Sequence, residues 1–202
     1  RYICVNKNIF LASYPKSGNT WLRSIILSSL QQNNIINIKD LSKIRLLSDK
    51  MNFTSFKNKI YDKKGLIDYD WMSKNLILCQ KKLNEKTKYN FFFKTHSVRH
   101  KSFTNKTVNA GFIYIVRDPR DIVVSLSNFT GINLDEAINQ IVFNKQLTTN
   151  ANGARELVSN WDLNIKSWLE YKSVPSLFIK YEDLLFKSNN TILKLSLIHI
   201  SE

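Results

Sequence analysis

Residues 13–21 read SYPKSGNTW and overlap the end of a strongly apolar run, Ile9–Tyr14. A helical pattern begins near Trp21, so the stretch is interpreted as a tight turn between a strand and a helix. Gly18 lets the backbone approach a ligand closely, and the free N–H groups of a helix start point at a bound anion. The polar side chains of the turn are those of Lys16, Ser17, Asn19 and Thr20. The stretch therefore predicts a cradle for a phosphate-like group, with Lys16 supplying positive charge.

This turn differs from the phosphate-binding loop of nucleotide triphosphatases. That loop reads G-x-x-x-x-G-K-[ST], with a lysine directly after the second glycine and a hydroxyl for magnesium. Here Lys16 precedes Gly18 by two positions. A P-loop nucleotide kinase, which shares the strand–loop–helix cradle but needs magnesium, is kept as an alternative function.

Four short apolar runs are predicted strands, and helical stretches separate them. They are Ile9–Tyr14, Phe91–Phe93, Phe112–Val116 and Leu177–Ile179. Before the last run, an apolar stripe at helical spacing predicts a helix over roughly 154–172. The stripe consists of Leu157, Trp161, Ile165 and Trp168. This alternation is typical of an α/β fold in which a parallel β-sheet is flanked by helices.

A second anion site is predicted where the strand Phe112–Val116 ends. The next residues, 117–121, read RDPRD, in which Asp118 is placed as a helix N-cap and Pro119 as the first helical residue. Arg117 and Ser125 can converge on one anion, because the planar arginine fork grips phosphate through two hydrogen bonds. The alternative is an ordinary surface ion pair between the arginine and one of the two aspartates of the motif.

Residues 91–96 read FFFKTH, a short aromatic strand with Lys94 and His96 at its carboxyl end. Open α/β sheets bind their ligands at this end of the strands. We predict that His96 is a general base, since neutral imidazole takes a hydroxyl proton near pH 7. Lys94 and Lys16 are expected to stabilise charge on a transferred group. His100 and His199 are interpreted as structural residues.

Residues 40–88 follow a less regular pattern, in which lysines interrupt a series of aromatic residues. The aromatic residues are Phe53, Phe56, Tyr61, Tyr69 and Trp71. Two interpretations are open: these side chains line an acceptor pocket, or they belong to a peripheral helical layer.

The composition narrows the class of partner. The net charge of +14 fits a polyanionic ligand or nucleic acid, but the lysines are scattered, which favours a solvated Lys-rich surface. A nucleic-acid-binding domain is the less favoured alternative, because the chain has no recognised nucleic-acid motif. Cys4 and Cys79 lack metal-ligand or C-x-x-C spacing, so we expect no disulfide framework and no metal site. A reducing, cytoplasmic location and no membrane span are expected.

Taken together, the motifs resemble those of the cytosolic-type sulfotransferases that use 3′-phosphoadenosine 5′-phosphosulfate (PAPS). The matching stretches are residues 14–21, Lys94-Thr95-His96, residues 116–121 with Ser125, and YEDL at 181–184. The resemblance implies a three-layer fold similar to P-loop nucleotide-binding domains. It also implies transfer of the PAPS sulfuryl group, without a metal, to a hydroxyl of a small-molecule acceptor.

The resemblance assigns the nucleotide-binding residues. The positions that match the 5′-phosphosulfate ligands are Lys16, Ser17, Gly18, Asn19 and Thr20. Trp21 and Tyr181 match residues beside the adenine. Arg117 and Ser125 match the ligands of the 3′-phosphate.

The resemblance also assigns the catalytic residues, and the chain departs from the family pattern at several positions. His96 matches the catalytic base, and Lys94 matches a lysine that assists transfer. Asn19 stands where threonine is usual, and Ser97-Val98-Arg99 replaces the common Leu-Pro. The identity of the acceptor is therefore not implied by the resemblance.

Residues 1–194 are expected to form a single sulfotransferase domain that is incomplete. The family closes its nucleotide site with a late basic, Gly-containing loop ending in Trp-Lys, and no such segment precedes Glu202. The chain begins with Arg1 rather than Met, so the sequence leaves open whether a leader precedes it. Residues 195–202, LSLIHISE, resemble translated adapter sequence and are interpreted as a non-native tail.

Overall fold

A computed structural model describes residues 7–30, 37–87, 90–145, 147–149 and 155–186. The strands are β1 (Asn8–Ser13), β2 (Phe91–Thr95), β3 (Asn109–Val116), β4 (Thr148–Thr149), β5 (Glu156–Leu157) and β6 (Ser176–Lys180). The α-helices are α1 (Asn19–Leu30), α2 (Tyr69–Lys74), α3 (Leu76–Lys86), α4 (Pro119–Thr130), α5 (Leu134–Ile138), α6 (Trp161–Leu169) and α7 (Tyr181–Phe186). Helical segments of other types are η1 (Ile38–Lys43), η2 (Lys50–Ile60) and η3 (Asn139–Phe143).

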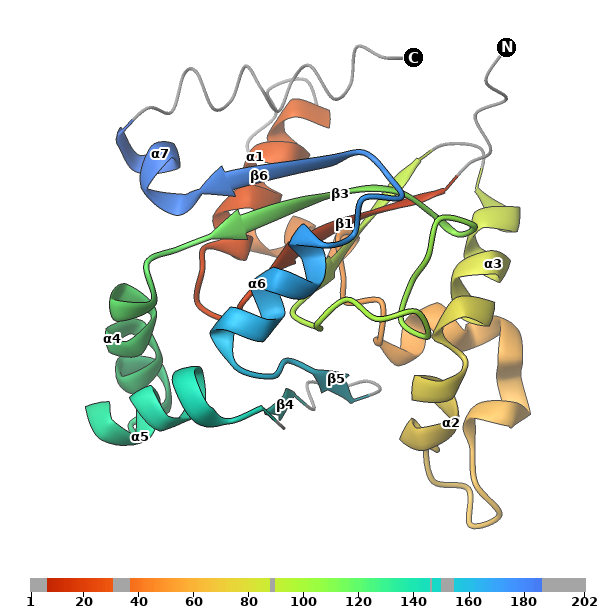
Figure 1. The fold of residues 1–202 in the computed structure, drawn as a ribbon. Helices are drawn as coiled ribbons and strands as arrows, with labels where there is room; N and C mark the ends of the chain where they lie inside the picture. The colour runs from red at the N-terminus through yellow and green to blue at the C-terminus, as the bar shows by residue number, and fades with distance from the viewer. Residues whose placement is uncertain (1–6, 31–36, 88–89, 146, 150–154, 187–202) are drawn as a thin grey trace.

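The main sheet has the strand order β2-β1-β3-β6, and every neighbouring pair is parallel (Figure 1). The four apolar runs of the sequence supply these four strands, so the predicted parallel α/β sheet is confirmed. Parallel strands need long crossover connections. Helices lie in the connections from β1 to β2 and from β3 to β6, whereas residues 96–108, between β2 and β3, form turns. Among the described residues, no helix is both long and apolar enough to cross a membrane.

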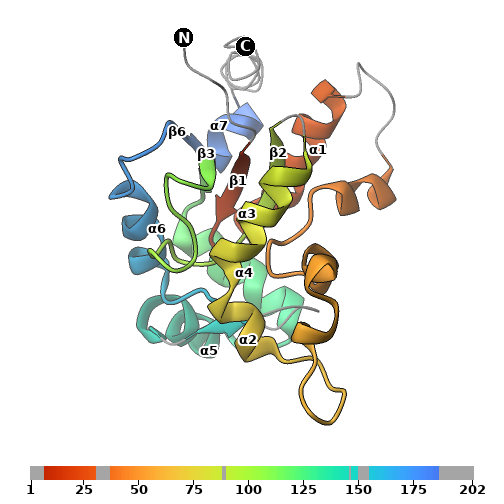
Figure 2. The same ribbon diagram turned by 90° about the vertical axis from the view of Figure 1, so that its right-hand side faces the viewer.

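Two apolar cores cover the two faces of the sheet. Phe10 of β1 belongs to a cluster that also contains Met72 of α2 and Trp168 of α6. Leu11, the next residue of β1, belongs to a second cluster with Ile26 of α1. Successive side chains of a strand point to opposite faces, so α2, α3 and α6 cover one face and α1 and α7 the other. Figure 2 shows α6 and α1 on either side of the strands, which makes three layers.

The helix expected over roughly 154–172 begins later than predicted. Residue 154 lies outside the described residues, and Leu157 belongs to β5, which pairs with β4 in an antiparallel manner. Ser159 then adopts a left-handed conformation with a φ of 62°. The Asn160 side chain caps the helix by accepting a hydrogen bond from the Leu163 N–H at 3.1 Å. A cap residue of this type ends the strand connection and fixes the helix start at Trp161.

The register of the sheet brings the sequence motifs to one edge. Ala12 of β1 lies opposite Thr95 of β2, and Ser13 lies opposite Ile115 of β3. The carboxyl ends of the three strands are therefore level with one another. The residues that follow them, including Lys16, His96 and Arg117, emerge at the same edge of the sheet.

Candidate active site

The turn after β1 depends on two residues with positive φ. Lys16 has a φ of 66° and Gly18 a φ of 93°, and the Ser17 N–H donates to the Tyr14 carbonyl at 3.3 Å. A Cβ atom on Gly18 would collide with the ring of Tyr181. Glycine is required here both by its conformation and by the space available. The tight turn predicted from the sequence is present, and α1 starts immediately after it at Asn19.

Tyr181, the first residue of α7, supports the turn and the arginine beside it. The guanidinium carbon of Arg117 lies 4.4 Å from the centre of the Tyr181 ring. Trp21 meets the same ring edge-on, with the ring centres 5.8 Å apart. Gly18, Trp21 and Arg117, which come from three separate motifs, therefore contact one aromatic ring. Stacking of this kind fixes the plane of a guanidinium group.

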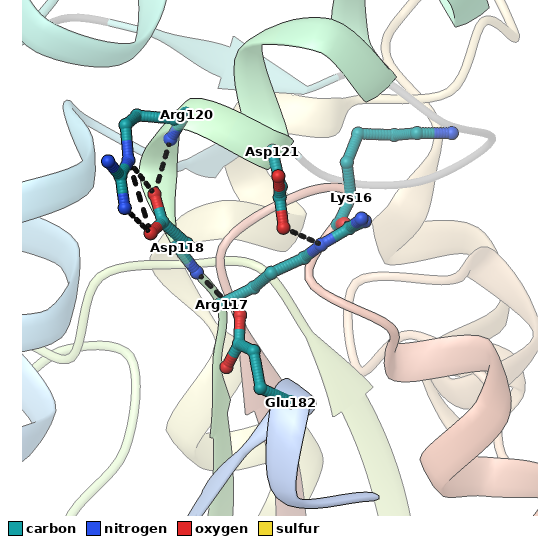
Figure 3. Close-up of polar contacts among 6 residues, drawn as sticks. All are labelled: Lys16, Arg117, Asp118, Arg120, Asp121 and Glu182. Carbon is teal, nitrogen blue, oxygen red and sulfur yellow. Dashed lines mark hydrogen bonds and ion pairs between the residues drawn. The ribbon is translucent and has the colours of Figure 1, made fainter. Parts of the chain in front are cut away.

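Arg117 is directed toward the turn (Figure 3). Its terminal NH1 donates to the Lys16 carbonyl at 3.1 Å, and its Nε lies 3.9 Å from a carboxylate oxygen of Asp121. The longer distance exceeds hydrogen-bonding range. Within the described part of the chain, the buried Nε of Arg117 has no hydrogen-bond partner. The guanidinium is thus held in place while one N–H group stays unsatisfied.

Asp118 is engaged elsewhere and is not the partner of Arg117. Its carboxylate accepts from the backbone N–H of Arg120 at 2.9 Å and from two nitrogens of the Arg120 side chain (Figure 3). Hydrogen bonds from Arg120 lower the pKa of Asp118 to about 2. The N-cap predicted at Asp118, with Pro119 as the first helical residue, is confirmed. The backbone N–H of Asp118 donates to the Glu182 side chain at 3.0 Å, which joins α4 to α7.

A cavity of about 470 Å³ lies at the carboxyl edge of the sheet. Of the residues singled out by the sequence, the cavity is lined by Lys16, Gly18, Asn19, Thr20, Lys94, His96, Arg117 and Ser125. Pro15 and Phe129 complete the lining. Ser17 is buried, and its hydroxyl has no hydrogen-bond partner among the described residues. Trp21 and Tyr181 do not line the cavity; they pack together beside it.

Lys16 and Asn19 have partners that the sequence did not reveal. The ammonium group of Lys16 lies 3.9 Å from the centre of the Phe129 ring, at the far end of α4. The amide nitrogen of Asn19 donates inward, to the Leu11 carbonyl at 2.9 Å and to the Ser13 hydroxyl at 3.2 Å. This amide therefore ties the start of α1 to β1. The Lys16 ammonium group, as a cation over an aromatic ring, is held weakly enough to move to a bound anion.

The ring of His96 is held through Nδ1. That atom lies 2.8 Å from the Ser13 carbonyl oxygen and 3.2 Å from the Ser13 hydroxyl. Because a carbonyl oxygen only accepts hydrogen bonds, this arrangement assigns the proton to Nδ1 and leaves the lone pair on Nε2. Burial, followed by the positive charge of Lys94, lowers the pKa of His96 to about 3, and Arg23 adds to the effect. The imidazole is neutral at pH 7.

Glu156 is a site residue that sequence reasoning missed. Its carboxylate is buried and accepts from the Thr95 hydroxyl at 3.1 Å and from the His96 N–H at 3.3 Å. Burial raises the pKa of Glu156 to about 7, although these hydrogen bonds and the charge of Lys94 oppose the rise. The carboxyl group therefore fixes the end of β2 from the side of β5. No motif surrounds Glu156 in the sequence, and the hydrogen bonds span about 60 residues.

Of the two interpretations left open for residues 40–88, the helical layer agrees better with the packing. Phe53 is buried in the core, and Phe56 and Trp71 pack together with ring centres 5.5 Å apart. Tyr61 and Tyr69 are exposed at the surface. None of the five aromatic residues lines the cavity at the sheet edge. Among the described residues, no group of three or more metal-binding side chains occurs.

Comparison with known proteins defines the class. Residues 6–196 match the family described as the sulfotransferase domain, so the chain belongs to that family. A curated relative, flavonol 3-sulfotransferase from Flaveria bidentis, is 25% identical over 183 residues, which cover 88% of this chain and 51% of the relative. The chain thus spans about half the length of that relative. The match supports the sulfotransferase interpretation over the kinase and nucleic-acid alternatives.

Solved structures support the same fold. Mouse sulfotransferase SULT7A1 complexed with PAP has a TM-score of 0.55 and 20% identity, covering 94% of this chain and 57% of that one. Retinol dehydratase in complex with retinol and PAP also has a TM-score of 0.55 and 20% identity, covering 93% and 58%. The similarity extends over almost the whole chain and confirms the α/β architecture. The predicted tail at 195–202, with His199, lies outside the described residues, as does Cys4.

Proposed function

We propose that this chain carries the donor site and the general base of a PAPS-dependent sulfotransferase that acts on a hydroxyl of a small molecule. The observation that carries the proposal is the cavity at the sheet edge, where Lys16, Lys94 and Arg117 meet His96. Three cations beside one neutral imidazole suit a ligand with several negative charges and a reaction that releases a proton.

The donor is proposed to bind along the turn after β1. Backbone N–H groups at the start of α1, with Lys16 and Thr20, would hold the 5′-phosphosulfate. The unsatisfied hydroxyl of Ser17 supports this placement, and the unsatisfied Nε of Arg117 supports an anion beside that arginine, since buried donors generally have partners. Arg117 and Ser125 would hold the 3′-phosphate. Trp21 and Tyr181 would lie beside the adenine.

The transfer step is proposed to be an in-line displacement at sulfur. The acceptor oxygen forms a bond to sulfur while the bond from sulfur to the bridging phosphate oxygen breaks, and His96 Nε2 takes the hydroxyl proton. Lys94 and Lys16 stabilise the charge on the sulfuryl oxygens and on the leaving phosphate. A bound anionic donor also offsets the two cations that lower the pKa of His96, so donor binding makes the imidazole a stronger base. The step as proposed uses no metal ion.

Calorimetric titration tests the donor site directly. The ligands are adenosine 3′,5′-bisphosphate (PAP) and adenosine 5′-monophosphate (AMP), each with and without magnesium. The proposal predicts that PAP binds more tightly than AMP and that magnesium has no effect. Equal affinities for PAP and AMP, or binding that depends on magnesium, would favour the nucleotide kinase alternative. If the protein binds neither nucleotide selectively but binds DNA or RNA with an affinity that falls steeply as salt is added, a nucleic-acid-binding domain is favoured.

A further inference from the structure

A second cavity, of about 340 Å³, lies beside the donor cavity. Its lining consists of Arg23, Leu41, Ser42, Arg45, Leu46, Asp49 and Lys94. Lys94 lines both cavities, so the two spaces adjoin at this residue. The second cavity therefore lies next to the position where the proposed reaction takes place.

The wall of this cavity is built by α1, β2, η1 and the segment that follows η1. The NH1 group of Arg23 donates to the carbonyls of Leu41 and Ile44, both at 3.1 Å. The backbone N–H of Lys94 donates to the Arg45 carbonyl at 2.9 Å, which joins the same segment to β2. The wall is thus fixed to the sheet and to α1 by hydrogen bonds that use neither the Arg45 side chain nor the Lys94 ammonium group.

Positive charge is in excess on this wall, where the lining has three cations, Arg23, Arg45 and Lys94, and one carboxylate, Asp49. No ion pair within the described residues involves Arg23, Arg45 or Lys94. The one carboxylate of the lining, Asp49, accepts from the backbone N–H of Met51 at 2.8 Å. Burial and the nearby charge of Arg23 lower the pKa of Lys94, although Glu156 opposes this. Cations gathered in one partly buried space repel one another, and an anion placed among them relieves that repulsion.

The cavity also has an apolar part, formed by the side chains of Leu41 and Leu46. A volume of about 340 Å³ suits a small organic molecule. Resting on the proposed function, we propose that this cavity receives the acceptor and selects acceptors that carry an anionic group, such as a carboxylate, in addition to the hydroxyl. The apolar side chains contact the body of the acceptor, and Arg45 and Arg23 hold its anionic group.

An anionic acceptor would differ from the small molecules bound to retinol dehydratase, one of the similar solved structures. Besides PAP, the small molecules named with retinol dehydratase are retinol and androsterone, both uncharged. An uncharged acceptor in the second cavity would leave Arg45 and Arg23 without an anion beside them. An anionic acceptor adds charge-assisted hydrogen bonds, which are stronger than bonds between neutral groups.

A binding experiment on the protein saturated with PAP tests the inference without any turnover. The probes are 4-hydroxyphenylacetate and its neutral analogue of nearly equal shape, 4-hydroxyphenylacetamide. We expect the carboxylate to bind at least about tenfold more tightly, which corresponds to about 1.4 kcal/mol. Arg45→Gln should remove most of this preference. Lys39→Gln, which removes the same charge from an exposed side chain on η1 outside the cavity, should leave the preference unchanged.

Each outcome decides between the two proposals. Loss of preference in Arg45→Gln alone, with PAP affinity retained, supports the acceptor site. If PAP binds but the two probes have equal affinities, or if both variants lose the preference equally, the acceptor inference is wrong and the donor site remains. If PAP does not bind to the unmodified protein, the proposed function fails, and the acceptor inference fails with it.

Discussion

The Nδ1 atom of His96 lies 2.8 Å from the backbone carbonyl oxygen of Ser13, which joins the ends of two neighbouring strands. A backbone acceptor cannot change its protonation state, so the proton on Nδ1 is held there independently of nearby side chains. The lone pair of the ring is left on Nε2. The sheet itself thus sets the tautomer that the proposed reaction needs.

His96→Gln should reduce turnover by about 10²- to 10⁴-fold while leaving PAP affinity nearly unchanged, because a general base acts on the acceptor proton. Steady-state rates and PAP titration measure the two effects. His100→Gln is the matched control, since the His100 ring bonds to Ser102 and does not line the donor cavity. Unaltered turnover in His96→Gln would show that His96 is not the general base.

Arg117→Met should weaken PAP by about 100-fold and AMP by less than about threefold, because only PAP carries the 3′-phosphate assigned to this arginine. Arg120→Met removes an equal charge three residues away, from an exposed side chain that pairs with Asp118. We expect that variant to bind both nucleotides like the unmodified protein. Equal losses of PAP and AMP in Arg117→Met would contradict the assignment.

Gly18→Ala should lower the free energy of unfolding by more than Gly65→Ala. Both glycines have positive φ, which costs an alanine about 1–2 kcal/mol. A Cβ atom at Gly65 meets nothing within 4 Å, whereas one at Gly18 collides with Tyr181. Urea denaturation of the two variants separates strain in the backbone from the collision. Equal losses in the free energy of unfolding would show that the Tyr181 ring moves aside for the added methyl group.

Glu156→Gln should change how stability depends on pH. In the folded protein the pKa of Glu156 is raised to about 7, so between its ordinary pKa of 4.5 and about 7 the folded state binds a proton that the unfolded state has released. The free energy of unfolding therefore falls as pH rises through this window. Glutamine does not titrate, so this fall should disappear in the variant. The lowered pKa of His96 makes the free energy of unfolding rise with pH, and this contribution is present in both proteins. It therefore cancels in the difference between their stabilities.

The comparison is made by urea denaturation of both proteins at several pH values between 4 and 8. The stability difference between them should slope across the window and level off on both sides. A difference that is constant with pH would show that the Glu156 carboxylate titrates normally.

Much of the fold and of the donor cavity could be predicted because the signals are local. The four strands are short apolar runs, the Asp118 cap directly precedes Pro119, and the residues of the turn are consecutive. Glu156 could not be predicted, because its hydrogen bonds to Thr95 and His96 form only when β5 is placed beside the end of β2.

The late start of α6 and the second cavity escaped prediction for related reasons. Leu157 fits a helical stripe by spacing, but the cap at Asn160 and the left-handed Ser159 outweigh that pattern. Arg23 and Arg45 read as ordinary surface cations in a chain with a net charge of +14. Only the segment that folds back onto α1 gathers them around Lys94.

Because Tyr181 packs against Gly18, the donor cavity depends on a residue that is added late in synthesis. A ribosome completes the turn after β1 long before it adds α7, so the turn first exists without the ring that packs beneath it. Gly18, Trp21 and Arg117 all rest on that ring. The donor cavity is therefore completed only when synthesis has passed residue 181. Until then, the nascent chain should hold the nucleotide poorly even where β1, β2 and β3 are already present.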